Sequence, residues 1–286
     1  MILDQALATA PPYLLHMLRG KADPQRAIAD GTGNPRPAAV RVCQLPCRSQ
    51  KACCMAESVS AIVRVMSGGG SFPSLVQTSA GRQYVMKLSG VGQGTSGLLT
   101  EFIAMRLAEA LGLNVPQVRA ITLSSALPWQ VGTDEFYEAL QRSSGWNLGV
   151  EFIDSARDLS ADDLNEIPGA FLDQLAAVDA LLQNVDRTAQ NPNLLQDDTG
   201  RYWAIDFGAC LFLERFGRHR QRMTFELPAN HFLAGRRVQP LQLDNAQAGL
   251  KEFVSEVPLS WLGVGGGEAL VDALSGLIEV YAQKTR

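Results

Sequence analysis

The fold class rests on one stretch, NVDRTAQNPNLLQDDTGRYWAIDFG at Asn184–Gly208. Within it, Asp186 is followed five positions later by Asn191 and twenty positions later by Asp206, the first residue of an Asp-Phe-Gly triplet. Two short runs of strand-forming residues, separated by turn-forming residues, predict a hairpin over residues 193–205. A hairpin there would bring the two polar ends of the stretch side by side.

These residue types in this order suit phosphoryl transfer, in which a protein contributes positioning and electrostatics more than covalent chemistry. The reaction needs a carboxylate beside the attacking hydroxyl and oxygen ligands for Mg²⁺ on ATP. Asp186 is the candidate catalytic base, and Asn191 and Asp206 are the candidate metal ligands. Mg²⁺ prefers hard oxygen ligands and keeps several waters, so these two residues and the phosphates suffice. Taken singly the residues fit plain turns and a salt bridge, but their joint spacing matches the catalytic loop of kinases.

Candidate nucleotide-binding residues lie upstream of this stretch. Lys87, in YVMKL, ends a predicted strand, where its ammonium can reach the α- and β-phosphates. Glu101 begins the helix that follows and can hold Lys87 in an ion pair. Gly68, Gly69 and Gly70 precede the next strand, where a flexible hairpin can cover phosphates with backbone N–H groups. The simpler alternatives are a solvated lysine, an acid favoured by the helix dipole and a plain glycine turn. The downstream stretch favours the binding roles.

Apolar periodicity predicts an α+β protein, with a mainly β part followed by a mainly helical part. We expect strands at 58–66, 74–78, 82–88 and 118–123, and helices at 98–113, 171–182, 243–256 and 267–283. The segment 147–153 has strand composition and is expected to connect the lobes, and polar loops are expected after the hairpin. The predicted parts are a poorly structured extension at 1–55, a mainly β, nucleotide-covering small lobe at 56–153, and a mainly helical, catalytic large lobe at 154–286.

The composition disfavours two classes of protein, nucleic-acid binders and membrane-spanning proteins. Lys and Arg total 25 against 29 Asp and Glu, a net charge of −4, which disfavours a nucleic-acid binder because such proteins usually carry a basic face. No apolar run approaches the 18 residues of a membrane span. The N-terminus carries Asp4 and lacks the basic region of a secretory signal. We therefore expect a cytoplasmic protein without a membrane span or direct nucleic-acid binding.

The cysteines do not indicate a metal site. Cys43, Cys47, Cys53 and Cys54 crowd into one stretch, and four thiols can in principle bind zinc. However, no second pair with matching spacing follows, and adjacent cysteines are awkward as ligands of one ion. We expect incidental thiols there. Cys210 lies in the apolar run ACLFL and is expected in the core.

The sequence resembles the HipA-like kinases, in particular their short bacterial branch. The resemblance covers residues 57–286 and is carried by GGGSFPSLV, YVMKLSGVGQG, LLTEFIA, LGLNVP, NLGVEFI, DALLQNVDRTAQNPNLL and AIDFGACL. The Asn-x-Asp-Arg-x-x-x-Asn signature is similar to that of HipA and, more distantly, of phosphatidylinositol kinases, whereas ordinary protein kinases carry His-Arg-Asp at this point. Many relatives have His where this chain has Phe207. The chain is shorter than HipA proteins proper, so their toxin role is not carried over.

The resemblance implies a two-lobed, protein-kinase-like fold with ATP and Mg²⁺ as cofactors. It also implies Asp186 as catalytic base, Asn191 and Asp206 as metal ligands, and Lys87 as the phosphate contact. The leading hypothesis for the acceptor is a Ser or Thr of a protein. A small molecule or a lipid headgroup is the alternative, because both groups of kinases share the Asn-x-Asp-Arg loop. A nucleotide-binding pseudokinase that acts as an interaction module is the third hypothesis. The acceptor depends on the shape of the cleft and on loops such as the polar stretch Arg215–Asn230.

Overall fold

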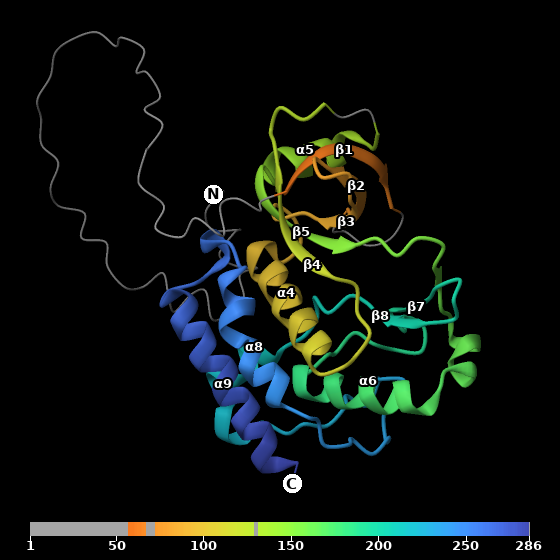
Figure 1. Cartoon of the computed structure of the whole chain (residues 1–286), viewed down its shortest axis with the longest axis vertical. Coiled ribbons are helices and arrows are strands. Elements are labelled where there is room, and N and C mark those ends of the chain that lie inside the picture. The colour runs from red at the N-terminus through yellow and green to blue at the C-terminus, as the bar shows by residue number, and fades with distance from the viewer. Residues whose placement is uncertain (1–56, 67–71, 129–130, 286) are drawn as a thin grey trace, which may run out of the picture. The chain divides into compact units, whose positions relative to one another are not determined.

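The computed structural model describes residues 57–66, 72–128 and 131–285, all within the compact unit Cys47–Arg286 (Figure 1). The predicted extension at 1–55, its clustered cysteines and the phosphate-covering role of Gly68, Gly69 and Gly70 lie outside the described residues.

A closed barrel forms the first part of the described chain, with the strand order β1-β2-β3-β5-β4. Its strands are β1 (Glu57–Val65), β2 (Ser74–Thr78), β3 (Gln83–Lys87), β4 (Val118–Leu123) and β5 (Gly145–Glu151). Neighbouring strands are antiparallel except β1 and β4, which run parallel and pair at only two positions, Glu57 with Ile121 and Ser58 with Thr122. Alternate side chains point inward, as the two-residue period of a strand requires, and Val76 and Met86 are fully buried there.

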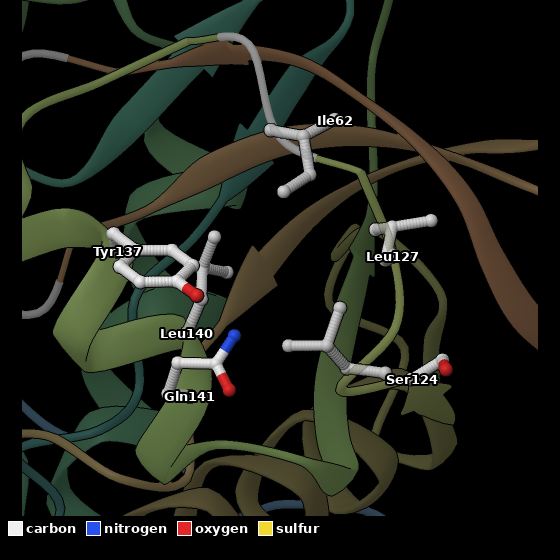
Figure 2. A pocket seen from close by; sticks show the side chains of 7 residues that line it. Ile62, Ser124, Leu127, Tyr137, Leu140 and Gln141 are labelled. Carbon is white, nitrogen blue, oxygen red and sulfur yellow. The ribbon is translucent and has the colours of Figure 1, made fainter.

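A helix missed by the sequence prediction, α5 (Asp134–Arg142), packs against this barrel. Thr133 caps its N-terminus by accepting a hydrogen bond from the backbone N–H of Phe136. Phe136 and Leu140 join the buried cluster of the barrel. Figure 2 shows a pocket between α5, β1 and the segment after β4. The helix thus covers the side of the barrel where β1 and β4 stop pairing.

The strand composition of residues 147–153 is confirmed by β5, which pairs with β3 on one side and β4 on the other. Leu148 and Val150 point away from the barrel interior into the larger core cluster. Gly149 points inward, where an added Cβ would lie 3.1 Å from side-chain atoms of both Tyr84 and Ile121. The lobe boundary expected at the end of this segment stays a prediction.

The larger core forms around α4 (Gly94–Ala110) and α6 (Gly169–Leu182), with α8 (Asp244–Ser255), η3 (Leu259–Trp261) and α9 (Gly266–Lys284). Helices α8 and α9 pack together, and α8 and η3 pack on α4 (Figure 1). The aromatic rings of Phe102 and Trp261 meet edge to face at 6.4 Å. All four predicted helices are present with shifted ends, and α4 begins four residues earlier than expected. None of the helices in the described part of the chain combines the length and apolar character that a membrane crossing needs.

The predicted hairpin is present. β7 (Leu194–Gln196) and β8 (Tyr202–Ala204) pair antiparallel, and the short β6 (Arg157–Asp158) extends the sheet in the order β6-β7-β8. The backbone N–H of Ile205 donates to the carbonyl of Asn193 at 3.0 Å, so the ends of the hairpin do lie side by side.

The expectation of polar loops after the hairpin holds for residues 223–243 but is wrong for residues 212–222. This region contains α7 (Phe212–His219) and a 3-10 turn, η2 (Arg220–Arg222), and another such turn, η1 (Ala161–Glu166), precedes α6. Phe212 and Phe216 are the buried residues of α7. Two apolar residues four positions apart give too little periodicity to predict a helix of eight residues.

Candidate active site

A partly buried ion-pair cluster joins the barrel to the helical core. Lys87 ends β3, and its Nζ lies 2.5 Å from Oε1 of Glu101 on α4 and 2.8 Å from Oδ1 of Asp206 after β8. The ion pair expected between Lys87 and Glu101 is therefore present. Glu101 does not lie in the first turn as expected but about two turns inside α4, where its residue is 2% exposed. The helix dipole cannot account for an acid at that position, whereas the Lys87 ammonium can.

Burial and mutual charge set the pKa values of these three groups. Burial lowers the pKa of Lys87, but the carboxylates of Glu101 and Asp206 outweigh it and hold the pKa above its ordinary value. Burial raises the pKa of Asp206, but the Lys87 ammonium outweighs it and the pKa lies below the ordinary value. For Glu101, burial raises the pKa and Lys87 only partly opposes the shift. Lys87 and Asp206 thus carry full charges at neutral pH.

The backbone presents the Asp206 carboxylate in an unusual conformation. Asp206 has a φ of 57°, in the left-handed region that Asp enters more readily than most residues. Its side chain stays 46% exposed although Oδ1 is bound to Lys87. An added Cβ on Gly208 would lie 3.4 Å from Oε2 of Glu101 and 3.6 Å from Oδ1 of Asp206. The triplet therefore turns the carboxylate toward Lys87 and leaves part of it accessible.

Asp186 and Asn191 meet on the loop after α6. Nδ2 of Asn191 donates to Oδ2 of Asp186 at 3.0 Å, and both residues are exposed. Two reciprocal backbone hydrogen bonds between Thr188 and Asn191, 3.1 and 3.2 Å long, close the turn between them. The five-residue spacing seen in the sequence is thus the span of one tight turn. Within the described residues, Oδ1 of Asn191 accepts no hydrogen bond.

A buried polar network lies beneath this loop, and we call Arg187, Asp179, His231 and Asn184 the Arg187 network. Nε of Arg187 donates to Oδ2 of Asp179 at 2.6 Å, and both side chains are 0% exposed. His231 lies 3.0 Å from the same oxygen through Nε2, and Asn184 donates to Oδ1 at 3.0 Å. The backbone N–H of Leu233 donates to Nδ1 of His231, so Nε2 carries the proton of the neutral ring and donates to Asp179. Asp179 thus accepts three hydrogen bonds.

Arg187 connects the loop of Asp186 to the segment between β8 and Asp206. One of its terminal nitrogens donates to the carbonyls of Pro192 and Asn193 at 2.9 and 2.8 Å, and the other to that of Ile205 at 3.4 Å. Burial raises the pKa of Asp179, but the Arg187 guanidinium outweighs it and the pKa lies below its ordinary value. A single buried side chain therefore fixes the relative positions of the candidate base and the candidate metal ligands.

With this geometry described, comparison with known proteins identifies the family. A family model described as HipA-like kinase matches residues 59–273. The chain belongs to the HipA-like kinase family. The crystal structure of a *Helicobacter pylori* proinflammatory kinase, CtkA, is similar with a TM-score of 0.50 and 12% sequence identity, covering 80% of this chain and 97% of that one. At that identity the likeness concerns the fold alone. No curated protein matches the chain.

The donor groups of this HipA-like kinase fit Mg²⁺ on a nucleotide. In the described part of the chain, no group of three or more His, Cys, Asp and Glu side chains is placed to hold an ion by itself. The exposed amide oxygen of Asn191 and the accessible carboxylate of Asp206 are hard oxygen donors. Mg²⁺ is commonly held by one or two such groups together with substrate phosphates and water. The residues present therefore fit the ion when phosphates complete its ligands.

Sequence reasoning missed two members of the Arg187 network. Asp179 is the second acid in the apolar helix FLDQLAAVDALL, and a buried acid in such a helix was a signal that could have indicated it. His231 lies 44 residues beyond Arg187 in a polar stretch, and no local pattern marks it. Cys210, by contrast, is in the core as predicted, and burial raises the pKa of its thiol.

Proposed function

We propose that this HipA-like kinase transfers the γ-phosphoryl group of ATP, with Mg²⁺, to a Ser or Thr hydroxyl of a protein. The observation that carries the proposal is the contact of Lys87 with both Glu101 and Asp206, since it joins the barrel to the end of the hairpin that follows the catalytic loop. In this proposal the barrel is the nucleotide-covering lobe at 56–153 and the helical part is the catalytic lobe at 154–286.

The proposed roles follow from charge and exposure. Lys87 contacts the α- and β-phosphates, and Glu101 keeps its ammonium in place when ATP binds. The acceptor oxygen attacks the γ-phosphorus, its proton passes to the exposed carboxylate of Asp186, and the bond to the bridging oxygen breaks so that ADP leaves with that electron pair. Asn191 and Asp206 would hold Mg²⁺, which neutralises charge on the phosphates when bound. The Arg187 network keeps Asp186 and Asn191 in register with Asp206 throughout.

Substitutions of Asp186 and of Asp206 test the proposal, because the first should abolish phosphoryl transfer and the second should weaken magnesium-dependent ATP binding. Ligand at about 100 times its dissociation constant stabilises a fold by roughly 2.7 kcal/mol, or about 5–10 °C in thermal midpoint at this size. Wild type and Asp186→Asn should both show that shift with Mg²⁺-ATP, but only wild type should transfer phosphate. Asp206→Asn should lose most of the magnesium-dependent shift. Equal shifts in all three proteins with no transfer to any acceptor would support a pseudokinase instead.

The class of acceptor is tested separately. Purified protein incubated with labelled ATP and cell lysate should place label in the protein fraction, with Asp186→Asn as the matched control. Label that depends on Asp186 but stays in the small-molecule or lipid fraction would contradict the protein acceptor and support the alternative kinase class.

A further inference from the structure

Positive charge is concentrated in the segment that follows the Asp-Phe-Gly triplet. We call this segment the arginine surface; its basic residues are Arg215, Arg218, His219, Arg220 and Arg222, on α7 and η2. All five are exposed, and Glu214 is the acid within the same two elements. The chain as a whole carries a net charge of −4. The arginine surface therefore opposes the overall charge and creates a local positive potential.

The arginine surface is attached to the start of the catalytic loop through Gln183. Its side-chain oxygen accepts a hydrogen bond from Arg215 at 2.6 Å, and its backbone carbonyl accepts one from the N–H of Leu211 at 3.2 Å. Its side-chain amide donates to the carbonyl of Thr224 at 3.0 Å. Three residues span at most about 11 Å, so the backbone of Gln183 lies within that distance of Asp186. Arg215, the first residue of the surface, therefore contacts a residue that lies three positions before Asp186 in the chain.

The elements that carry these arginines pack against the core. Phe212 and Phe216 bury the inner face of α7 in the core. Gly276 on α9 allows close packing, since an added Cβ would lie 2.8 Å from the ring of Phe216 and 3.0 Å from a guanidinium nitrogen of Arg220. The same guanidinium lies 5.1 Å from the ring centroid of Phe216. The exposed cations are therefore held on packed elements, which favours recognition of a specific partner.

Among the described residues, the acids that pair with the arginine surface are themselves exposed. Arg218 pairs with Glu214 at 3.1 Å, and Arg220 lies 4.0 Å from Glu279 with both side chains more than half exposed. Exposed pairs of this kind are weak and exchange readily with a competing carboxylate. Arg222 makes no hydrogen bond or ion pair with any described residue. Glu226 lies four residues beyond Arg222 in the sequence. The ammonium of Lys284 donates a hydrogen bond to the carbonyl of Met223, which places a further positive charge next to the surface.

We propose that the arginine surface binds acidic residues flanking the acceptor hydroxyl, so that the substrate is an acidic protein segment. The inference rests on the proposed function and names its substrate class. Guanidinium groups bind carboxylates in a bidentate geometry, and such charge-assisted hydrogen bonds are strong. A purely structural role explains less of the cluster. A cation in the last turn stabilises a helix dipole, which accounts for Arg218 but not for Arg222 beyond the helix.

Peptides that differ only in charge test this inference. Synthetic serine peptides with acidic, neutral and basic flanks are assayed for kcat/KM with Mg²⁺-ATP and, independently, for Kd by fluorescence anisotropy. The acidic peptide should bind and react about tenfold better than the neutral one, and the preference should shrink as salt rises. Arg218→Gln with Arg222→Gln should remove most of the preference. The matched control is Arg237→Gln, an exposed arginine outside the surface, which should retain it.

The possible failures are distinguishable. Equal Kd and equal kcat/KM for all three peptides would overturn the inference while the proposed function stands. Preferential binding of the acidic peptide without transfer, with label in lysate confined to small molecules, would support the surface but contradict the protein acceptor. Binding of single-stranded RNA that depends on Arg218 and Arg222, without a peptide preference, would overturn the inference in favour of a nucleic-acid surface.

Discussion

His231→Phe removes two hydrogen bonds from the Arg187 network without adding a charge. Asp179 loses the donor at 3.0 Å, and the backbone N–H of Leu233 loses its acceptor at 3.0 Å. A hydrogen bond to a charged group contributes about 1.5–3 kcal/mol, and a buried donor left unpaired costs about 1–3 kcal/mol. We therefore expect the free energy of unfolding to fall by about 3–5 kcal/mol, which lowers the thermal midpoint by roughly 10 °C in a unit of this size.

The same variant should slow phosphoryl transfer. Asp179 loses one of the bonds that orient it against Arg187, and Arg187 positions the carbonyls next to Asn191 and Asp206. A misplacement of about 1 Å in a catalytic group costs on the order of 10²-fold in rate. We expect kcat to fall by that factor with little change in the KM for ATP, measured well below the midpoint of the variant.

Two further substitutions separate positioning from stability. His231→Gln can replace the Nε2 donor to Asp179, whereas His231→Asn can replace only the Nδ1 acceptor for Leu233. If His231 positions Asp179, the Gln variant should recover most of kcat and the Asn variant should not. Equal kcat in the two variants, or a kcat that simply follows the thermal midpoint across the series, would refute the positioning role.

Three other predictions concern the ion-pair cluster and the N-terminal region. Lys87→Met should reduce turnover at least about 10²-fold because it removes a preorganised charge; if Lys87→Met and Glu101→Gln both turn over like wild type, the assignment of the phosphate contact is wrong. The pKa of Asp206 is lowered in the folded state, so the stability it contributes is present above its unfolded pKa and lost as pH falls through the folded value. Thermal midpoints measured from pH 7 downward should thus fall less steeply for Asp206→Asn than for wild type, and parallel curves would contradict this. A chain that begins at Met55 should keep its thermal midpoint and nucleotide affinity, because it retains Glu57 and its hydrogen bonds to Thr78 and Arg82; loss of cooperative unfolding would show that residues 1–54 belong to the core.

Local sequence pattern was enough for the parts of the site that depend on neighbours along the chain. Two short strand-forming runs predicted the hairpin over residues 193–205, and it is present. The position of Lys87 at a strand end and of Glu101 on the next helix predicted their ion pair. Long helices such as α4 and α6 were predictable for the same reason, since many apolar residues repeat at helical spacing within them.

Tertiary structure decided the features whose partners lie far apart in sequence. The composition of β5 was read correctly as a strand, but only its pairing with β3 and β4 made it part of the barrel. The simpler interpretation of Asp186 and Arg187 in the sequence was a salt bridge between them. In the structure Arg187 is fully buried and pairs with Asp179, which also contacts His231. A contact between residues more than 40 positions apart leaves no periodic trace in either segment. Such contacts depend on how the elements pack against one another. The sequence therefore identified the candidate groups of this site but not the buried Arg187 network that positions them.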